Sequence, residues 1–201
     1  MQPRVNPRPQ RRLRYRMAGW ALACAATLWP DAGMAAPAAG QSQAPGTPLE
    51  RRVKAAFLYK FLGYAEFPAD AFPGPGAPLT IGVVDADDLA EELARIVSGR
   101  TVGNRGIAVR RLAESEIGAP VHMLFVGGID AGRVGRLLRQ AGALLVVTES
   151  ENALPQGSAI NFHIVDERVR FDVALDAAEK NGVKLSSRLL TVANHVQKGA
   201  Q

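Results

Sequence analysis

Three acidic residues, Asp85, Asp87 and Asp88, directly follow the apolar run 79–84. The carboxyl ends of strands in α/β proteins often carry binding sites, so a pair of these acids could hold Mg²⁺ as in a response-regulator receiver. A receiver also needs a phosphoacceptor Asp at the end of a later strand, and neither 121–126 nor 143–148 supplies one. The sequence therefore disfavours a receiver-type metal site.

A glycine pair, Gly127 and Gly128, separates an apolar run from a predicted helix that begins at Asp130. Helix N-termini attract anions, so this turn could cradle a phosphate. The full G-x-G-x-x-G pattern and the Walker A lysine are both missing. We therefore favour the alternative, a tight turn in which Asp130 caps the helix.

Histidine and serine residues give no catalytic pattern. The three histidines lack the i, i+4 spacing of a helical zinc pair, and His122 lies inside an apolar run that favours a core or sheet position. Ser186 and Ser187 lack a G-x-S-x-G elbow, so a helix-capping role is favoured. We expect no enzyme activity, no metal and no cofactor.

Arg170 is the strongest candidate for binding a ligand. It alternates with Val169 and Phe171, so its side chain points away from theirs. Arginine is a good partner for a carboxylate or phosphate, and Asn161 on a neighbouring predicted strand is a second candidate. We nevertheless favour the alternative for Arg170, a cross-strand ion pair on a solvated face.

The elements that position these residues alternate between strands and helices, which predicts an α/β fold. Its expected form is three-layered, a mostly parallel sheet flanked by helices. Strands are predicted at 79–84, 107–112, 121–126 and 143–148, and helices at 85–97, capped by Asp87 or Asp88, and at 130–141. The chain should end in a β-hairpin (160–165 and 169–174), a short helix (175–181) and a terminal helix with apolar positions from Leu185 to Val196.

An amphipathic pattern predicts a helix at 50–64, with one apolar stripe through Val53, Ala56, Phe57, Phe61 and Tyr64. Two further leucines widen this stripe beyond one narrow face. A small domain would not cover all of it, and exposed apolar patches usually mark contact surfaces. We therefore expect a protein contact formed by Phe57, Leu58, Phe61, Leu62 and the following Phe67.

Charge is distributed unevenly along the 201 residues, whose formal net charge is +5. Residues 1–35 hold six arginines and one acid, whereas the rest of the chain holds 18 basic and 18 acidic residues. A generally basic surface for nucleic acid is therefore not expected.

The N-terminus has the pattern of an export signal. A basic stretch ending at Arg16 precedes 13 mostly apolar residues, 17–29, fewer than the roughly 20 that a membrane-spanning helix needs. Small residues then favour cleavage after Ala35. We expect a cleaved signal peptide (1–35), a flexible linker (36–48) and one domain (49–201).

Two alternatives to this signal remain open. Leu22-Ala23-Cys24 resembles a lipobox, which would make Cys24 a lipidated first residue, and Arg11-Arg12 could belong to a twin-arginine signal. Cys24 is the only cysteine, so the chain forms no intrachain disulfide.

Seven runs along the domain carry a family resemblance. They are 53–61 (VKAAFLYKF), 66–68 (EFP), 79–84 (LTIGVV), 99–102 (GRTV), 160–162 (INF), 169–173 (VRFDV) and 184–190 (KLSSRLL). Together, over residues 49–196, they resemble the YfiR family of periplasmic proteins. Two departures are that Phe67 stands where a Trp often precedes the proline, and that the domain has no cysteine pair, so redox sensing is not implied.

The resemblance implies an exported, homodimeric α/β domain. Such proteins bind the periplasmic domain of an inner-membrane diguanylate cyclase and hold it inactive, which lowers cyclic-di-GMP, and an outer-membrane lipoprotein can sequester them. The contact predicted at 57–67 would then serve the homodimer or the cyclase. A periplasmic sensor whose main partner is a small molecule is the alternative function.

Overall fold

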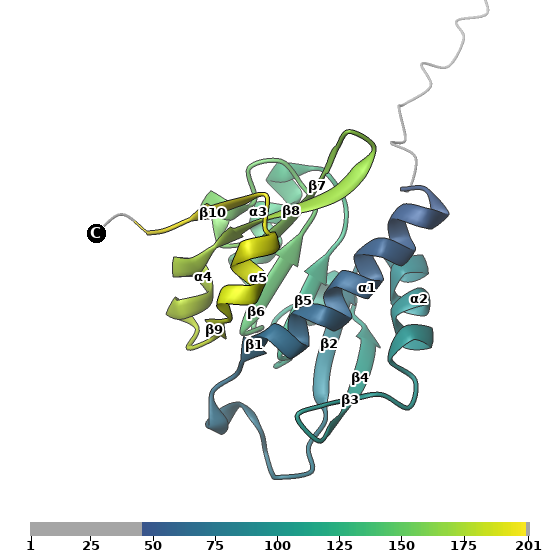
Figure 1. The fold of residues 1–201 in the computed structure, drawn as a ribbon, viewed down its shortest axis with the longest axis vertical. Helices are drawn as coiled ribbons and strands as arrows, with labels where there is room; N and C mark the ends of the chain where they lie inside the picture. The colour runs from purple at the N-terminus through teal and green to yellow at the C-terminus, as the bar shows by residue number, and fades with distance from the viewer. Residues whose placement is uncertain (1–45, 200–201) are drawn as a thin grey trace, which may run out of the picture. The chain divides into compact units, whose positions relative to one another are not determined.

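Apolar runs pair side by side to form an eight-stranded sheet in the computed structural model, which describes residues 46–199 (Figure 1). The predicted signal peptide and all but the last three linker residues lie outside the described range. The sheet order is β10-β8-β7-β6-β5-β2-β4-β3. Its strands are β2 (Leu79–Val84), β3 (Thr101–Val102), β4 (Arg105–Arg111), β5 (Met123–Val126), β6 (Leu145–Thr148), β7 (Ile160–Val165), β8 (Arg168–Ala174) and β10 (His195–Gln197).

Pairing in this sheet is mostly parallel: β4, β2, β5, β6 and β7 run in one direction. β8 is antiparallel to β7, and β3 is antiparallel to β4. The turn between β7 and β8 has only two residues, Asp166 and Glu167, with φ of 48° and 59°. Positive φ at both positions matches the right-handed twist of a two-residue hairpin. The predicted C-terminal hairpin is confirmed.

Helices cover both faces of the sheet. One apolar core joins α1 (Pro48–Tyr64), α2 (Asp87–Val97) and α5 (Ser187–Val192) to one face, and the other core joins α3 (Ala131–Leu138) to the opposite face. The remaining short elements are α4 (Leu175–Lys180), a two-stranded sheet of β1 (Ala65–Glu66) and β9 (Lys184–Leu185), and three 3-10 turns (Ala69–Ala71, Glu114–Glu116, Leu154–Gln156). The predicted three-layer α/β architecture is confirmed.

Phenylalanine rings fix α1 on the hairpin strands. Phe61 lies 5.0 Å from Phe171 and 5.7 Å from Phe162, measured between ring centroids, and Phe57 lies 5.4 Å from Phe171. Offset and edge-on aromatic pairs of this kind add about 1 kcal/mol each to the burial of the rings. Helix α1 therefore packs on strands β7 and β8 of the sheet as well as on α2.

The chain end departs from the predicted terminal helix. Leu185 lies in β9, α5 ends at Val192, and Val196 belongs to β10, which runs parallel to β8. The open edge of β8 offers unpaired backbone groups, and the N–H of Asn194 donates to the carbonyl of Phe171 at 2.9 Å. The predicted terminal helix is therefore present as α5, but it ends at Val192 because the following residues pair with the edge of β8.

The predicted cap of α2 was also wrong. Ala86 is the N-cap residue and forms no side-chain cap. Asp87 and Asp88 instead lie in the first turn, where a negative charge complements the positive end of the helix dipole.

Candidate functional site

The carboxyl ends of β2 and β5 are where an α/β sheet of this order would place a ligand crevice. After β2 the chain passes through α2 to β4 on one side of the β2–β5 pair, and after β5 it passes through α3 to β6 on the opposite side of that pair. Ligand crevices form between two such neighbouring strands, whose connections lead in opposite directions. Here the two loops touch: a Cβ on Gly127 would lie 2.6 Å from the carbonyl oxygen of Asp85. The β2–α2 and β5–α3 loops are therefore in close backbone contact at this point.

The N–H groups that could cradle a phosphate bind carboxylates of the chain itself. The Gly128 N–H donates to Oε1 of Glu149 at 3.0 Å, and the Arg133 N–H donates to Oδ1 of Asp130 at 2.8 Å. Asp130 is therefore the N-cap of α3, as predicted. The structure favours the tight-turn interpretation of this glycine pair over the phosphate cradle.

The three acids after β2 point to three different arginines. Asp85 pairs with Arg133, which also binds Glu114, while Asp87 lies 3.9 Å from Arg111 and Asp88 lies 3.8 Å from Arg51. Among residues 46–199 no cluster of three potential metal ligands occurs. Their arrangement is that of separate ion pairs rather than a cation site.

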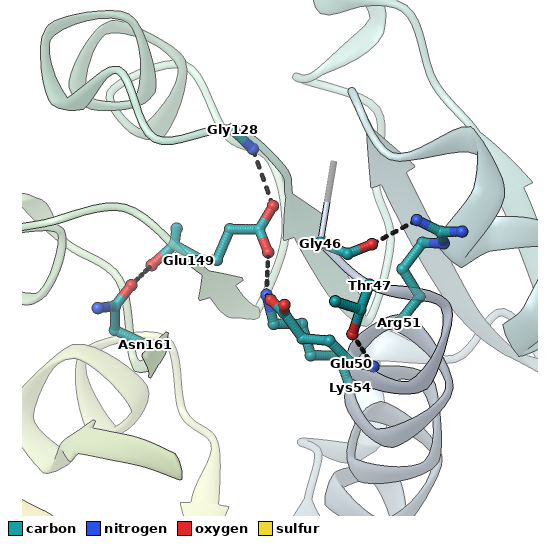
Figure 2. Close-up of polar contacts among 9 residues, drawn as sticks. Gly46, Thr47, Glu50, Arg51, Lys54, Gly128, Glu149 and Asn161 are labelled. Carbon is teal, nitrogen blue, oxygen red and sulfur yellow. Dashed lines mark hydrogen bonds and ion pairs between the residues drawn. The ribbon is translucent and has the colours of Figure 1, made fainter. Parts of the chain in front are cut away.

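Lys54 forms a buried ionic link between α1 and the end of β6 (Figure 2). Its side chain is almost fully buried, and its Nζ lies 2.6 Å from Oε2 of Glu149 and also binds Glu50. Burial alone would lower the pKa of Lys54, but attraction to Glu149 and Glu50 outweighs it and raises the pKa. The lysine is therefore charged, and Glu149 joins α1 to the β5–α3 turn through Gly128.

The sequence contained a signal for this link that the predicted stripe did not use. The buried residues of α1 are Lys54, Ala55, Leu58, Phe61 and Leu62, which follow helical spacing on a face shifted from the predicted one. A lysine within an apolar stripe is rarely buried unless it is paired. Its partner, 95 residues away, could not be identified without the fold.

Asn161, a predicted ligand residue, takes part in an internal polar cluster. Its Oδ1 lies 2.6 Å from Oγ1 of Thr148, which lies 2.8 Å from Oγ of the buried Ser158. The same serine donates to the carbonyl of Ile160 at 2.8 Å. The Asn161 amide oxygen therefore links β7 to β6. Binding of a ligand by Asn161 stays a prediction.

Arg170 lies exposed on the same sheet face as Asn161. In the antiparallel register Asn161 faces Asp172 and His163 faces Arg170. Asp172 pairs with His163 at 3.7 Å and accepts from the Asn194 amide at 2.9 Å, whereas Arg170 forms no ion pair with another residue of the described chain. The nearby acid Asp172 thus contacts His163 and Asn194 instead, which leaves the Arg170 guanidinium accessible.

The contact predicted along α1 needs partial correction. Leu58, Phe61 and Leu62 are at most 1% exposed, because the sheet, α2 and α5 together cover them. The expectation that one domain could not bury them was wrong. Phe57 and Phe67 are only partly buried, and their role in a protein contact stays a prediction.

A shallow hollow of about 430 Å³ lies between the end of α2 and strands β3 and β4. Val97 and Ile107 form part of its apolar wall, and Arg100 brings a charge to its rim. The Arg100 guanidinium lies 5.2 Å from the Tyr59 ring centroid, which orients the guanidinium by a cation–π contact.

The capping role predicted for Ser186 is confirmed. The Leu189 N–H donates to Oγ of Ser186 at 3.4 Å, so Ser186 caps the start of α5.

The protein is a three-layer α/β domain, and the charged side chains at the carboxyl end of its sheet mainly link one element to another.

The family described as YfiR/HmsC-like matches residues 51–194, and the chain belongs to that family. A search of curated proteins found no match. The family is one of periplasmic regulators of diguanylate cyclase signalling rather than of enzymes. Residues 46–199 contain no helix that is both long and apolar enough to cross a membrane.

Proposed function

We propose that this protein is exported to the periplasm, binds the periplasmic domain of an inner-membrane diguanylate cyclase, and holds that cyclase inactive. The observation that carries the proposal is the family match, which covers nearly all of the described domain. Lys54 and the Gly128 N–H both bind Glu149, so these charged and polar groups have structural partners within the domain.

The proposed contact surface includes Phe57 and Phe67, the partly exposed aromatic residues of α1 and the segment after it. Aromatic residues are enriched in the cores of protein interfaces. This surface would serve either a homodimer or the cyclase. Sequestration by an outer-membrane lipoprotein would reverse the inhibition by competing for the free protein.

A pull-down tests the partner directly. The mature domain, tagged at its C-terminus, is mixed with detergent-solubilised inner membranes, and bound proteins are identified by mass spectrometry. We expect a membrane protein that carries a cyclase (GGDEF) domain, and its enrichment should fall when excess untagged protein is added. Failure to enrich any such protein would contradict the proposal.

Export is tested by the intact mass of the protein recovered from the periplasm. We propose cleavage after Ala35, so the mature chain should start at Ala36 and contain no cysteine. A chain that starts at a diacylated Cys24 would contradict this and support the lipoprotein alternative.

A small-molecule sensor is the second candidate function, and the accessible guanidinium of Arg170 is the observation that favours it. A ligand with a carboxylate or phosphate would pair with that group. Native mass spectrometry of the purified protein would reveal a co-purified ligand, and Arg170→Gln should remove it. A ligand-free protein that still inhibits the cyclase would exclude this function as the main one.

A further inference from the structure

His122 lies at the amino end of the parallel strands, where it contacts the long segment between β1 and β2. Its ring stacks on Phe72 with 4.5 Å between centroids and meets the edge of Phe67 at 5.7 Å. Arg105 also stacks on Phe72, at 3.8 Å from the ring centroid. His122 and Arg105 therefore hold segment 67–77 through two of its own rings, Phe67 and Phe72, and these four side chains are called the stack below.

Segment 67–77 depends on this stack because its own backbone bonds are local. The hydrogen bonds found within it join Ala71 to Pro68, Phe72 to Ala69 and Ala77 to Gly74. Arg105 adds bonds to the carbonyls of Gly74 and Ala77, at 3.0 and 2.8 Å. The contacts of His122 with Phe67 and Phe72 therefore act together with the two Arg105 bonds and with packing on the core to hold the segment against the sheet.

The neutral imidazole is the form that fits this site. The backbone N–H of Thr80 donates to Nδ1 of His122 at 3.0 Å, so the ring proton resides on Nε2. Nε2 is buried and forms no hydrogen bond of ordinary geometry with the described residues, although the Ala71 carbonyl lies near the ring. A second proton, on Nδ1, would face the Thr80 donor and break this bond.

Charges around the ring also oppose protonation. Arg105 contacts the same Phe72 ring as His122 and already brings one positive charge. Strand β2 contains no acidic residue that could offset the second positive charge of a protonated His122. On the covering segment and beside it, Glu66, Asp70 and Lys184 are all exposed to solvent. Burial lowers the pKa of His122, the Ala71 carbonyl partly offsets this, and Arg105 lowers it further.

We propose that His122 is a pH-sensitive latch, which holds segment 67–77 closed while the imidazole is neutral and releases it when Nδ1 is protonated. Because the folded pKa is lowered, closure is fully stable above the ordinary histidine value of 6.5 and weakens as pH falls below it. Release would expose Phe67 and Phe72 and so change the surface that the protein presents. The latch does not depend on which partner the protein binds.

Hydrogen–deuterium exchange of the full mature protein at pH 7.5 and pH 5 tests the latch. After correction for intrinsic exchange rates, the opening equilibrium of segment 67–77 should rise by up to about 30-fold at pH 5, the limit in which only the open form binds the proton. Peptides from β5 and β6 should change little. Equal protection of the segment at both pH values would overturn the proposal.

Substitutions test whether the pH response belongs to His122 or to another histidine. His122→Phe keeps a stacking ring without a titratable group, so segment 67–77 should stay protected at pH 5. His122→Asn keeps an acceptor for Thr80 and should also lose the pH dependence, whereas His163→Asn should retain it. A pH response that survives in both His122 variants would refute the latch.

An NMR titration of the unmodified protein covers the case in which these variants fail to fold. The ¹⁵N shifts should show Nδ1 of His122 as the unprotonated nitrogen at pH 7.5, and its pKa should lie below 6.5. A pKa at or above 6.5, or a proton on Nδ1 at neutral pH, would equally overturn the proposal.

Discussion

The Nζ of Lys54 lies 2.6 Å from Oε2 of Glu149, and both side chains are largely buried where α1 crosses the end of β6. This contact joins two segments separated by 95 residues, and Glu149 extends it to the β5–α3 turn through the Gly128 N–H. One carboxylate thus links α1, the end of β6 and the β5–α3 turn.

Glu149→Gln should lower the free energy of unfolding by about 3 kcal/mol, because it weakens the pairing of a buried lysine. Chemical denaturation at pH 7 measures the loss. Glu91→Gln is the matched control, since its partner Arg95 is exposed and such pairs contribute about 1 kcal/mol or less. An equal, small effect of both changes would contradict the structural role of Glu149.

The same link predicts a pH dependence at the alkaline end. Because the folded pKa of Lys54 is raised, the stability it contributes is complete below its ordinary value of 10.5 and is lost as pH rises through the folded value. Thermal melts between pH 10 and pH 12 should fall more steeply for the unmodified protein than for Lys54→Met. Parallel curves would show that this lysine does not control the alkaline limit.

Gly127→Ala should destabilise the domain by about 1–3 kcal/mol, because its Cβ would meet the Asp85 carbonyl oxygen at 2.6 Å, and backbone cannot yield as a flexible side chain can. Gly106→Ala is the control, since a Cβ there meets nothing within 4 Å. Similar melting temperatures for the two variants would mean that the β2 and β5 loops do not touch as described.

Aromatic residues of the proposed contact can be separated from the core by substitution. Leu58→Glu should unfold the domain, because the leucine is fully buried and the new charge would have no partner. Phe57→Glu loses the aromatic contact with Phe171 and should melt at a lower temperature, but at this partly exposed position it should remain folded by circular dichroism while losing dimerisation or partner binding. The exposed Lys60→Glu on the same helix should lose neither. Folded Phe57→Glu that still dimerises and binds would place the contact elsewhere.

Strands and helices were predictable where their residues carry a local pattern. The run 79–84 forms β2 with the predicted bounds, and the apolar residues of 121–126 are buried, because hydrophobic runs of that length fit a sheet covered on both faces. Asp130 could likewise be predicted as a cap from its place before the helix, since the cap bond spans three residues.

Features that depend on distant partners were not predictable. β10 formed because β8 has an open edge, and the residues 193–197 alone fit a helix as well as a strand. The buried face of α1 is set by the sheet, α2 and α5, which the helical period alone does not reveal. At the candidate site, Arg170 was predicted to point away from Phe171, but its lack of an ion pair follows from Asp172 turning to His163 and Asn194.

The cellular concentration of cyclic-di-GMP tests the central claim most directly. It is measured by mass spectrometry in cells that lack this protein, in the same cells with the complete chain restored, and in cells that carry residues 49–201 without the export signal. We predict a rise without the protein, a return to the original level with the complete chain, and no return with the unexported domain. An unchanged concentration in all three strains would contradict the proposal that this protein restrains a diguanylate cyclase from the periplasm.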